Sequence, residues 1–200
     1  MNVFDFDKTI FNGDSTAKFY KYCIKKYPRV LRHLPSMVCA FVRYYIFKKG
    51  TKTQCKQIFY RFLHEIPDVD KAVSDFWDKN YDGIFDWYKK LHTADDIIIS
   101  ASPVFLLEGI CKRLEVAKLM ASRVDKSTGI YDGENCHGEE KVRRFCDYLP
   151  DGEIDEFYSD SISDLPLARI AKKAYVITKD GKVKDWGTVF PGTLNQSESV

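Results

Sequence analysis

The chain has 200 residues, of which 44% are hydrophobic and 30% charged, values that fit one folded domain or a core domain with an insertion and exclude extensive disorder. Six scattered cysteines form no Cys-x-x-Cys pair, and the four histidines do not join them at zinc-ligand spacing. No apolar run reaches the roughly 20 residues that span a bilayer. Asp5 and Asp7 interrupt the first apolar stretch, whereas a signal peptide has an uninterrupted apolar region. We therefore expect a cytoplasmic protein.

The charge of the chain is unevenly distributed. The formal net charge is only +2, yet residues 15–64 contain twelve lysines and arginines and no aspartate or glutamate. The remainder holds 19 basic against 29 acidic residues. We therefore expect residues 15–64 to face something anionic.

The first half of the chain begins with a strand and continues as helices. Residues 2–6 form a short apolar run that ends in acids, which predicts a buried strand. The turn residues Asn12 and Gly13 precede Ser15, a good helix N-cap. From about residue 15 to residue 92, apolar residues recur at helical spacing, so we expect a small helical bundle.

In the second half of the chain, strands alternate with helices. The β-branched run over residues 96–100 is typical of a parallel strand buried on both faces. Further strands are predicted near residues 118–123, 156–160 and 174–177, helices over 104–113, 139–148 and 163–172, and a hairpin over 129–135. This alternation predicts an α/β fold with a parallel sheet.

Acidic and hydroxyl side chains stand at the carboxyl ends of three predicted strands, where α/β proteins gather their chemistry. Asp5 and Asp7 are two residues apart, so both side chains can point into one site. Ser100 ends the second of these strands, and Asp160 and Asp164 follow the third. Clustered carboxylates repel one another unless a cation lies among them, and oxygen ligands without Cys or His favour Mg²⁺.

Four segments together resemble the motifs of the haloacid dehalogenase superfamily of phosphotransferases. In chain order they are Val3-Phe4-Asp5-Phe6-Asp7-Lys8-Thr9, Ile97-Ile98-Ile99-Ser100, Lys141 after His137-Gly138-Glu139-Glu140, and Phe157-Tyr158-Ser159-Asp160-Ser161-Ile162-Ser163-Asp164. All four occur in the family's order over about residues 1–180. The resemblance implies a Rossmann-like core over residues 1–14 and 93–187, a helical-bundle cap over 15–92 inserted after the first strand, and a C-terminal tail over 188–200.

The family's mechanism implies a Mg²⁺-dependent phosphatase that hydrolyses a phosphate monoester. Asp5 is then the nucleophile that forms an aspartyl-phosphate, and Asp7 is the acid and base. The phosphoryl oxygens are held by Ser100, the backbone at Ala101 and Lys141.

The same resemblance implies a metal site and a supporting acid. Asp5, Asp160 and the backbone carbonyl of Asp7 bind Mg²⁺, while Asp164 supports the metal or orients Lys141. Each residue also has an ordinary explanation when taken alone: an aspartate at a strand end is usually a turn or cap residue, and Lys141 alone would be a solvated helix residue.

The predicted cap resembles that of the phosphoserine phosphatase-like branch, which implies a small phosphorylated metabolite as substrate. Asp14 stands where that branch places a glutamate that meets the substrate's amine, although it could equally be a helix cap. Arg61 is a candidate for gripping a substrate carboxylate.

A lipid head-group phosphatase is the alternative, because the cap also resembles that of phosphatidylglycerophosphate phosphatases. Residues 29–50 combine a long apolar stretch with basic flanks, which suits peripheral contact with an anionic membrane. Residues 37–47 could instead be the cap's core helix. A non-catalytic protein that binds anionic membranes is a further alternative, and no nucleic-acid partner is expected since no recognition motif accompanies the basic segment.

Overall fold

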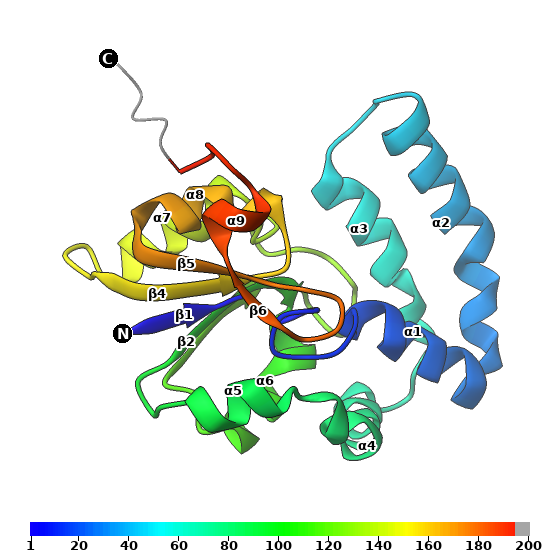
Figure 1. The fold of residues 1–200 in the computed structure, drawn as a ribbon. Coiled ribbons are helices and arrows are strands. Elements are labelled where there is room, and N and C mark those ends of the chain that lie inside the picture. The colour runs from blue at the N-terminus through cyan, green and yellow to red at the C-terminus, as the bar shows by residue number, and fades with distance from the viewer. Residues whose placement is uncertain (195–200) are drawn as a thin grey trace.

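The computed structural model describes residues 1–194 and contains a six-stranded sheet with the strand order β3-β2-β1-β4-β5-β6 (Figure 1). Strands β1 to β5 are parallel, and β6 runs antiparallel to β5. The strands are β1 (Asn2–Phe4), β2 (Ile97–Pro103), β3 (Lys118–Ser122), β4 (Ile154–Ser159), β5 (Ala171–Ile177) and β6 (Val183–Asp185). The predicted α/β fold with a mostly parallel sheet is confirmed.

The helices fall into a group before β2 and a group after it. The first group is α1 (Ser15–Lys26), α2 (Leu34–Phe41), α3 (Lys52–Tyr60), α4 (Val69–Asn80) and α5 (Asp86–Leu91). The second is α6 (Val104–Arg113), α7 (Glu139–Tyr148), α8 (Leu165–Ile170) and α9 (Trp186–Val189). Short 3₁₀ segments are η1 (Pro28–His33), η3 (Arg61–Glu65), η4 (Tyr81–Gly83) and η5 (Ile162–Asp164), and η2 (Val42–Ile46) is a π-helical turn.

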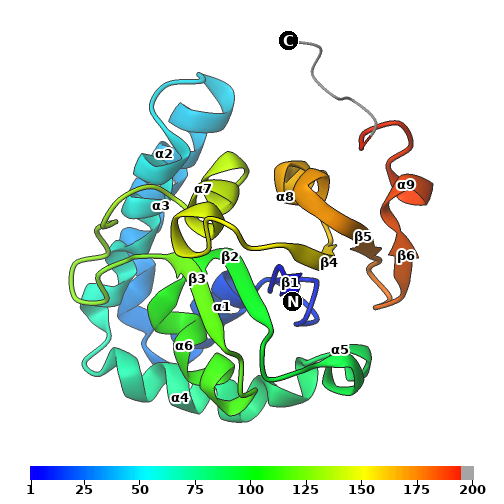
Figure 2. The same cartoon turned by 90° about the vertical axis from the view of Figure 1, so that its left-hand side faces the viewer.

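Both faces of the middle of the sheet are covered, which explains why Val3 and Phe4 in β1 and residues 97–99 in β2 form buried apolar runs. Along β1, Val3 packs into one hydrophobic cluster and Phe4 into the other, since successive side chains point to opposite faces. Helices α7, α8 and α9 lie on the Val3 face, and α4, α5 and α6 lie on the Phe4 face (Figure 2). Val3 pairs with Ile97 on one side and Phe157 on the other, so β1, β2 and β4 end at the same edge of the sheet.

The segments from α1 to η3 rise beside the core (Figure 1), and we call residues 15–65 the cap. Its helices have strong start signals: Asp14 caps α1 by accepting a hydrogen bond of 2.8 Å from Ala17 N, and Thr51 with Gln54 forms a capping box at α3. Helices α4 and α5, which the sequence places in the same insert, pack on the core, and α4 also packs on α1 through Phe76 and Phe19. Trp77 on α4 donates a hydrogen bond of 2.6 Å to the carbonyl of Leu106 on α6.

Some predicted elements differ from the structure in the last third of the chain. The helix expected through residue 172 ends at Ile170, and the stretch expected to form a hairpin contributes one bridge, Val124 to Tyr131. Strand β6 escapes prediction because all three of its residues are exposed and carry no burial pattern. Residues 188–194, expected as tail, lie against the core, where Trp186 donates a hydrogen bond to Thr193. The rest of the predicted tail lies outside the described residues.

Among residues 1–194, no helix is both long enough and apolar enough to cross a membrane.

Candidate active site

A buried lysine joins two carboxylates where β1 and β4 end. The Nζ of Lys141 lies 2.7 Å from Asp5 Oδ1 and 2.8 Å from Asp164 Oδ2. Only 2% of the Lys141 side chain is exposed, so this residue is not the solvated helix lysine that its sequence context alone allows. Ser159 donates a further hydrogen bond of 2.7 Å to Asp164 Oδ2. Gly138, whose φ is 61°, starts α7 with a backbone conformation that favours glycine, three residues before Lys141.

The electrostatics of this group follow from its burial. Burial raises the pKa of Asp5 to about 7, although the positive charge of Lys141 opposes the rise. Burial alone would lower the pKa of Lys141, but the charges of Asp5 and Asp164 raise it above its usual value. Lys141 therefore stays positively charged and offsets the negative charge on Asp5. No hydrogen bond to Asp5 Oδ2 is found within residues 1–194, which leaves this oxygen open for chemistry.

Asp7 is held at the start of α1 by two donors. The backbone N–H of Ser15 donates to Asp7 Oδ1 at 2.7 Å, and the hydroxyl of Ser102 donates to Asp7 Oδ2 at 2.5 Å. Burial, followed by the nearby charge of Asp14, raises the pKa of Asp7 to about 6, while the Ser102 and Ser15 hydrogen bonds oppose the rise. A carboxyl group with this pKa can donate and accept a proton near neutral pH.

Ser102 is a site residue that the sequence reasoning missed. Its hydroxyl bonds Asp7 and also lies 3.1 Å from the Ser15 hydroxyl and 3.2 Å from that of Thr16. The sequence spacing could have identified Ser102. It lies two residues after Ser100 on β2, and residues two apart on a strand point to the same face.

The predicted phosphate-binding residues lie on an irregular part of β2. Ser100 is buried and its hydroxyl accepts a hydrogen bond of 3.2 Å from Ser102 N. The pairing register shifts between Ser100 and Pro103, so the backbone around Ala101 departs from the regular ladder. The carbonyl of Ala101 accepts hydrogen bonds from Lys56 at 3.1 Å and from Ser122 at 3.0 Å.

Two cap lysines also reach the site, and the sequence reasoning assigned neither. Lys56 on α3 donates to Ala101 and, at 2.8 Å, to the side chain of Asn135, and burial lowers its pKa to about 8. Lys52 lies one helical turn earlier. Burial lowers its pKa, and the charge of Asp164 only partly opposes this. Their spacing of four residues places both on one face of α3, toward the core.

The predicted metal ligands are oxygen donors at the same edge of the sheet. Asp160 is partly buried, its pKa is raised by that burial, and the ammonium of Lys8 lies 3.9 Å from it at the surface. Within residues 1–194, no three His, Cys, Asp or Glu side chains form a metal site by themselves. A Mg²⁺ site made of Asp5, Asp160 and the Asp7 carbonyl needs only two carboxylate side chains. Mg²⁺ usually binds one or two carboxylates and completes its shell with water and substrate oxygens.

The two predicted specificity residues differ in position. Asp14 caps α1 and also lies close enough to Asp7 to raise its pKa, so it borders the site. Arg61 is exposed after the end of α3, where it lines a cavity of about 610 Å³ between α2, α3 and the loop near Thr128. The side chain of Tyr60, the preceding residue, points toward the site, and its hydroxyl lies 3.2 Å from the Thr16 hydroxyl. Because neighbouring residues of a helix point in different directions, the Arg61 side chain does not share this orientation.

A buried lysine between two carboxylates, beside a second aspartate held by hydroxyl and backbone donors, defines a hydrolase site at the strand ends of an α/β sheet. Residues 3–169 match the family model described as haloacid dehalogenase-like hydrolase. The chain belongs to this family, and it is an enzyme of the phosphatase class.

One curated protein and several solved structures are similar to the chain. The chain is 21% identical to a histidinol-phosphatase of Neisseria meningitidis serogroup C (strain 8013), over 91% of each chain. A protein of unknown function from Bordetella pertussis Tohama I has a similar fold, with a TM-score of 0.71, 17% identity and 87% of each chain covered. A phosphoserine phosphohydrolase-like protein from Francisella tularensis gives a TM-score of 0.53 at 16% identity, covering 87% of this chain and 86% of that one. At these identities the structures support the fold alone.

Proposed function

We propose that the protein is a Mg²⁺-dependent phosphomonoesterase that works through an aspartyl-phosphate on Asp5. The observation that carries the proposal is the buried ion-pair cluster, in which Lys141 contacts one oxygen of Asp5 at 2.7 Å and leaves the other open. A purely structural salt bridge would not need a second aspartate nearby, Asp7, held by the hydroxyl of Ser102 from the neighbouring strand β2.

In the first step, Asp5 Oδ2 attacks the phosphorus, and the bond between phosphorus and the leaving oxygen breaks. Asp7 donates its proton to that oxygen, so the product leaves as an alcohol. The raised pKa of Asp7, about 6, keeps an adequate protonated fraction for this step. Lys141 stays paired with Asp5 Oδ1 and offsets the negative charge that gathers around the phosphoryl group.

In the second step, Asp7, now ionised, takes a proton from a water molecule as that water attacks the phosphorus of the aspartyl-phosphate. The bond between Asp5 and phosphorus breaks, inorganic phosphate leaves, and both aspartates return to their starting states. Ser102 and the Ser15 N–H hold Asp7 in place for both proton transfers. We assign Ser100 and the backbone N–H at Ala101 to the phosphoryl oxygens, because both belong to β2, the strand that pairs with β1.

Asp5, Asp160 and the carbonyl of Asp7 would hold the metal ion. When bound, Mg²⁺ stabilises negative charge on the phosphoryl group and orients it. Asp164 acts on Lys141, whose ammonium it contacts at 2.8 Å, and that contact favours the role of orienting Lys141 over one on the metal.

For the substrate, we propose a small phosphorylated compound whose leaving group carries a carboxylate, as in phosphoserine. Lys56 supports this, because it extends from the cap to the backbone of Ala101, and Lys52 lies one helical turn before it, close enough to Asp164 to be influenced by that charge. Asp14 at the border of the site is a candidate for an amine on such a substrate. Arg61 lines the cavity beside α2 and α3, and we do not propose it as the carboxylate partner.

The test is release of phosphate from p-nitrophenyl phosphate by the full chain, with Mg²⁺ and with a chelator. We expect activity only with the metal. A panel of phosphoserine, histidinol phosphate, sugar phosphates, nucleotides and phosphatidylglycerophosphate then ranks substrates by kcat/KM. Metal-independent turnover, or a preference for substrates whose leaving groups lack any anionic group, would contradict the proposal.

A further inference from the structure

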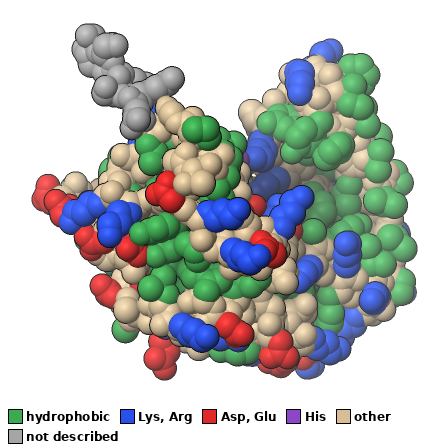
Figure 3. Space-filling view, in the orientation of Figure 1, with side chains coloured by type: hydrophobic (Ala, Val, Ile, Leu, Met, Phe, Trp, Pro, Cys, Tyr) green, Lys and Arg blue, Asp and Glu red, His purple; other side chains and the backbone are tan. Residues whose placement is uncertain are grey.

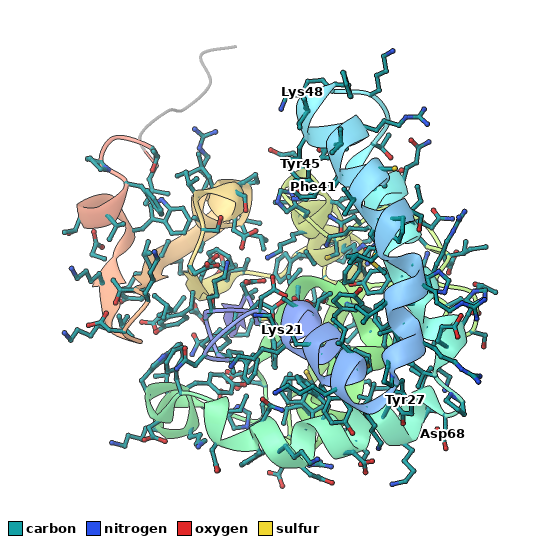
Figure 4. All side chains as sticks on the ribbon, turned by 90° about the vertical axis from the view of Figure 1, so that its right-hand side faces the viewer. Lys21, Tyr27, Phe41, Tyr45, Lys48 and Asp68 are labelled. Carbon is teal, nitrogen blue, oxygen red and sulfur yellow. The ribbon has the colours of Figure 1, made fainter. Side chains whose placement is uncertain are left out.

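A row of large apolar side chains lies exposed on the outer helical segment of the cap, from η1 through α2 to η2. Successive members are three or four residues apart, so they share one helical face. Between 44% and 56% of each side chain is exposed in this row, which we call the apolar stripe: Leu31, Leu34, Val38, Phe41 and Tyr45. Figure 4 shows Phe41 and Tyr45 on the same side of the helix, and their ring centroids are 4.3 Å apart.

The stripe is not needed for the cap's own core. Val30, Met37 and Ala40, on another face of the same segment, are the residues that this segment buries against the rest of the cap. The helical segment therefore has one apolar face inside the protein and a second one outside it. A contiguous apolar surface of this kind marks a site of interaction.

The stripe ends at a compact apolar and basic tip. Ile46 and Phe47 expose 66% and 65% of their side chains, and Lys48 and Lys49 follow them directly. The tip is an ordered turn, because Lys49 N donates a hydrogen bond of 3.0 Å to the carbonyl of Arg43. It therefore presents apolar and basic side chains next to one another.

Charge selects the kind of partner that can cover the stripe. No acidic residue occurs between residues 15 and 64, and Arg29, Arg32 and Arg43 alternate with the stripe along the chain. A second copy docked face to face would oppose like charges across the contact, which is unfavourable. An anionic partner with an apolar interior is complementary to both features, and a bilayer that contains anionic lipids is such a partner.

We propose that the apolar stripe and the tip dock on the surface of an anionic lipid bilayer. The apolar side chains enter the boundary between head groups and acyl chains, and Lys48 and Lys49 lie among the lipid phosphates. Figure 3 shows a hollow between cap and core with Lys and Arg side chains on its walls. Docking of the tip brings this hollow, and with it the proposed catalytic group, next to the membrane surface.

The test is co-sedimentation of the full chain with vesicles of phosphatidylcholine alone and of phosphatidylcholine mixed equally with phosphatidylglycerol. We expect binding to the mixed vesicles only, and weaker binding at high salt. The double variant Phe41→Ser/Tyr45→Ser should bind roughly tenfold more weakly or worse, because both rings lose their apolar burial in the membrane. The control Ile170→Ser/Val183→Ser, which removes two exposed apolar side chains from the core, should bind like the wild type.

Hydrolysis of soluble p-nitrophenyl phosphate separates this proposal from the enzymatic one, since the stripe lies outside the catalytic group and both double variants should keep wild-type turnover. Absence of wild-type binding to the mixed vesicles, or equal binding by Phe41→Ser/Tyr45→Ser, would overturn docking while leaving the phosphatase intact. A concentration-dependent dimer that the same variant dissociates would also overturn it, and would assign the stripe to a second copy.

Discussion

The ammonium of Lys141 and the carboxylate of Asp164 form an ion pair of 2.8 Å in which no more than 3% of either side chain is exposed. The two residues come from different helical segments, α7 and η5, on one face of the sheet. The pair fixes Lys141 against Asp5, so the geometry around Asp5 depends on a contact that is not itself part of the reaction. Removing either member tests that dependence.

Lys141→Met should destabilise the protein much more than Asp164→Asn. The first variant leaves two buried carboxylates beside each other without a cation, and the expected cost is about 3–5 kcal/mol of unfolding free energy. The second keeps Lys141 paired with Asp5 and costs about 1 kcal/mol. Urea unfolding at neutral pH measures both values. Equal costs would mean that Asp164, not Asp5, is the main partner of Lys141.

Asp7→Asn should improve stability in a pH-dependent way when no Mg²⁺ is added. The pKa of Asp7 is raised from 3.8 to about 6 in the folded protein, so the folded state holds the proton more tightly and ionisation of Asp7 destabilises it as the pH rises. Because Asp7 is only half-buried, we expect the gain of the variant over the wild type to grow between about pH 4 and pH 6 and to level off at about 1–2 kcal/mol above that range. Thermal unfolding across this range is the measurement, and a constant difference would refute it.

Ser102→Ala should move the acidic limb of the kcat profile to higher pH. The Ser102 hydroxyl stabilises ionised Asp7, so its loss raises the pKa of Asp7, and the step that needs Asp7 as a base then requires a higher pH. The expected displacement is about half a pH unit to one unit. Ser127→Ala, on an exposed loop, serves as the control and should keep the wild-type profile.

Lys56→Met should raise KM for an anionic substrate roughly tenfold and change kcat less, because Lys56 belongs to the cap and contacts the backbone at Ala101. The pKa of Lys56 is lowered to about 8, so the wild-type KM should rise above that pH as the charge is lost. The variant should not show this rise. Lys25→Met, on an exposed part of α1, is the matched control, and a KM change as large in that variant would remove the role assigned to Lys56.

Much of the core could be predicted because its local signals are strong. Helices α6 and α7 have the predicted bounds, since Pro103 and Gly138 mark their starts and their apolar spacing is regular. The position of Asp5 directly after one strand and of Asp164 a few residues after another was enough to expect them in one site, and the structure joins them through Lys141.

The remaining features depend on tertiary contacts that carry no local pattern. The basic face of α3 could be recognised as cationic, but which lysines reach the core depends on how the cap packs, and Lys56 is selected by Asn135 and Ala101, far away in sequence. Trp77 similarly draws α4 onto the core through its contacts with Phe6 and Phe11.

The most direct test of the central claim is phosphate release by Asp5→Asn compared with the wild type. The substitution is nearly isosteric and removes the nucleophile while keeping an amide beside Lys141, so circular dichroism should show a folded variant. With p-nitrophenyl phosphate and Mg²⁺, we predict a fall in kcat of about a thousandfold or more. Wild-type turnover by folded Asp5→Asn would contradict the assignment of Asp5 as the residue that receives the phosphoryl group.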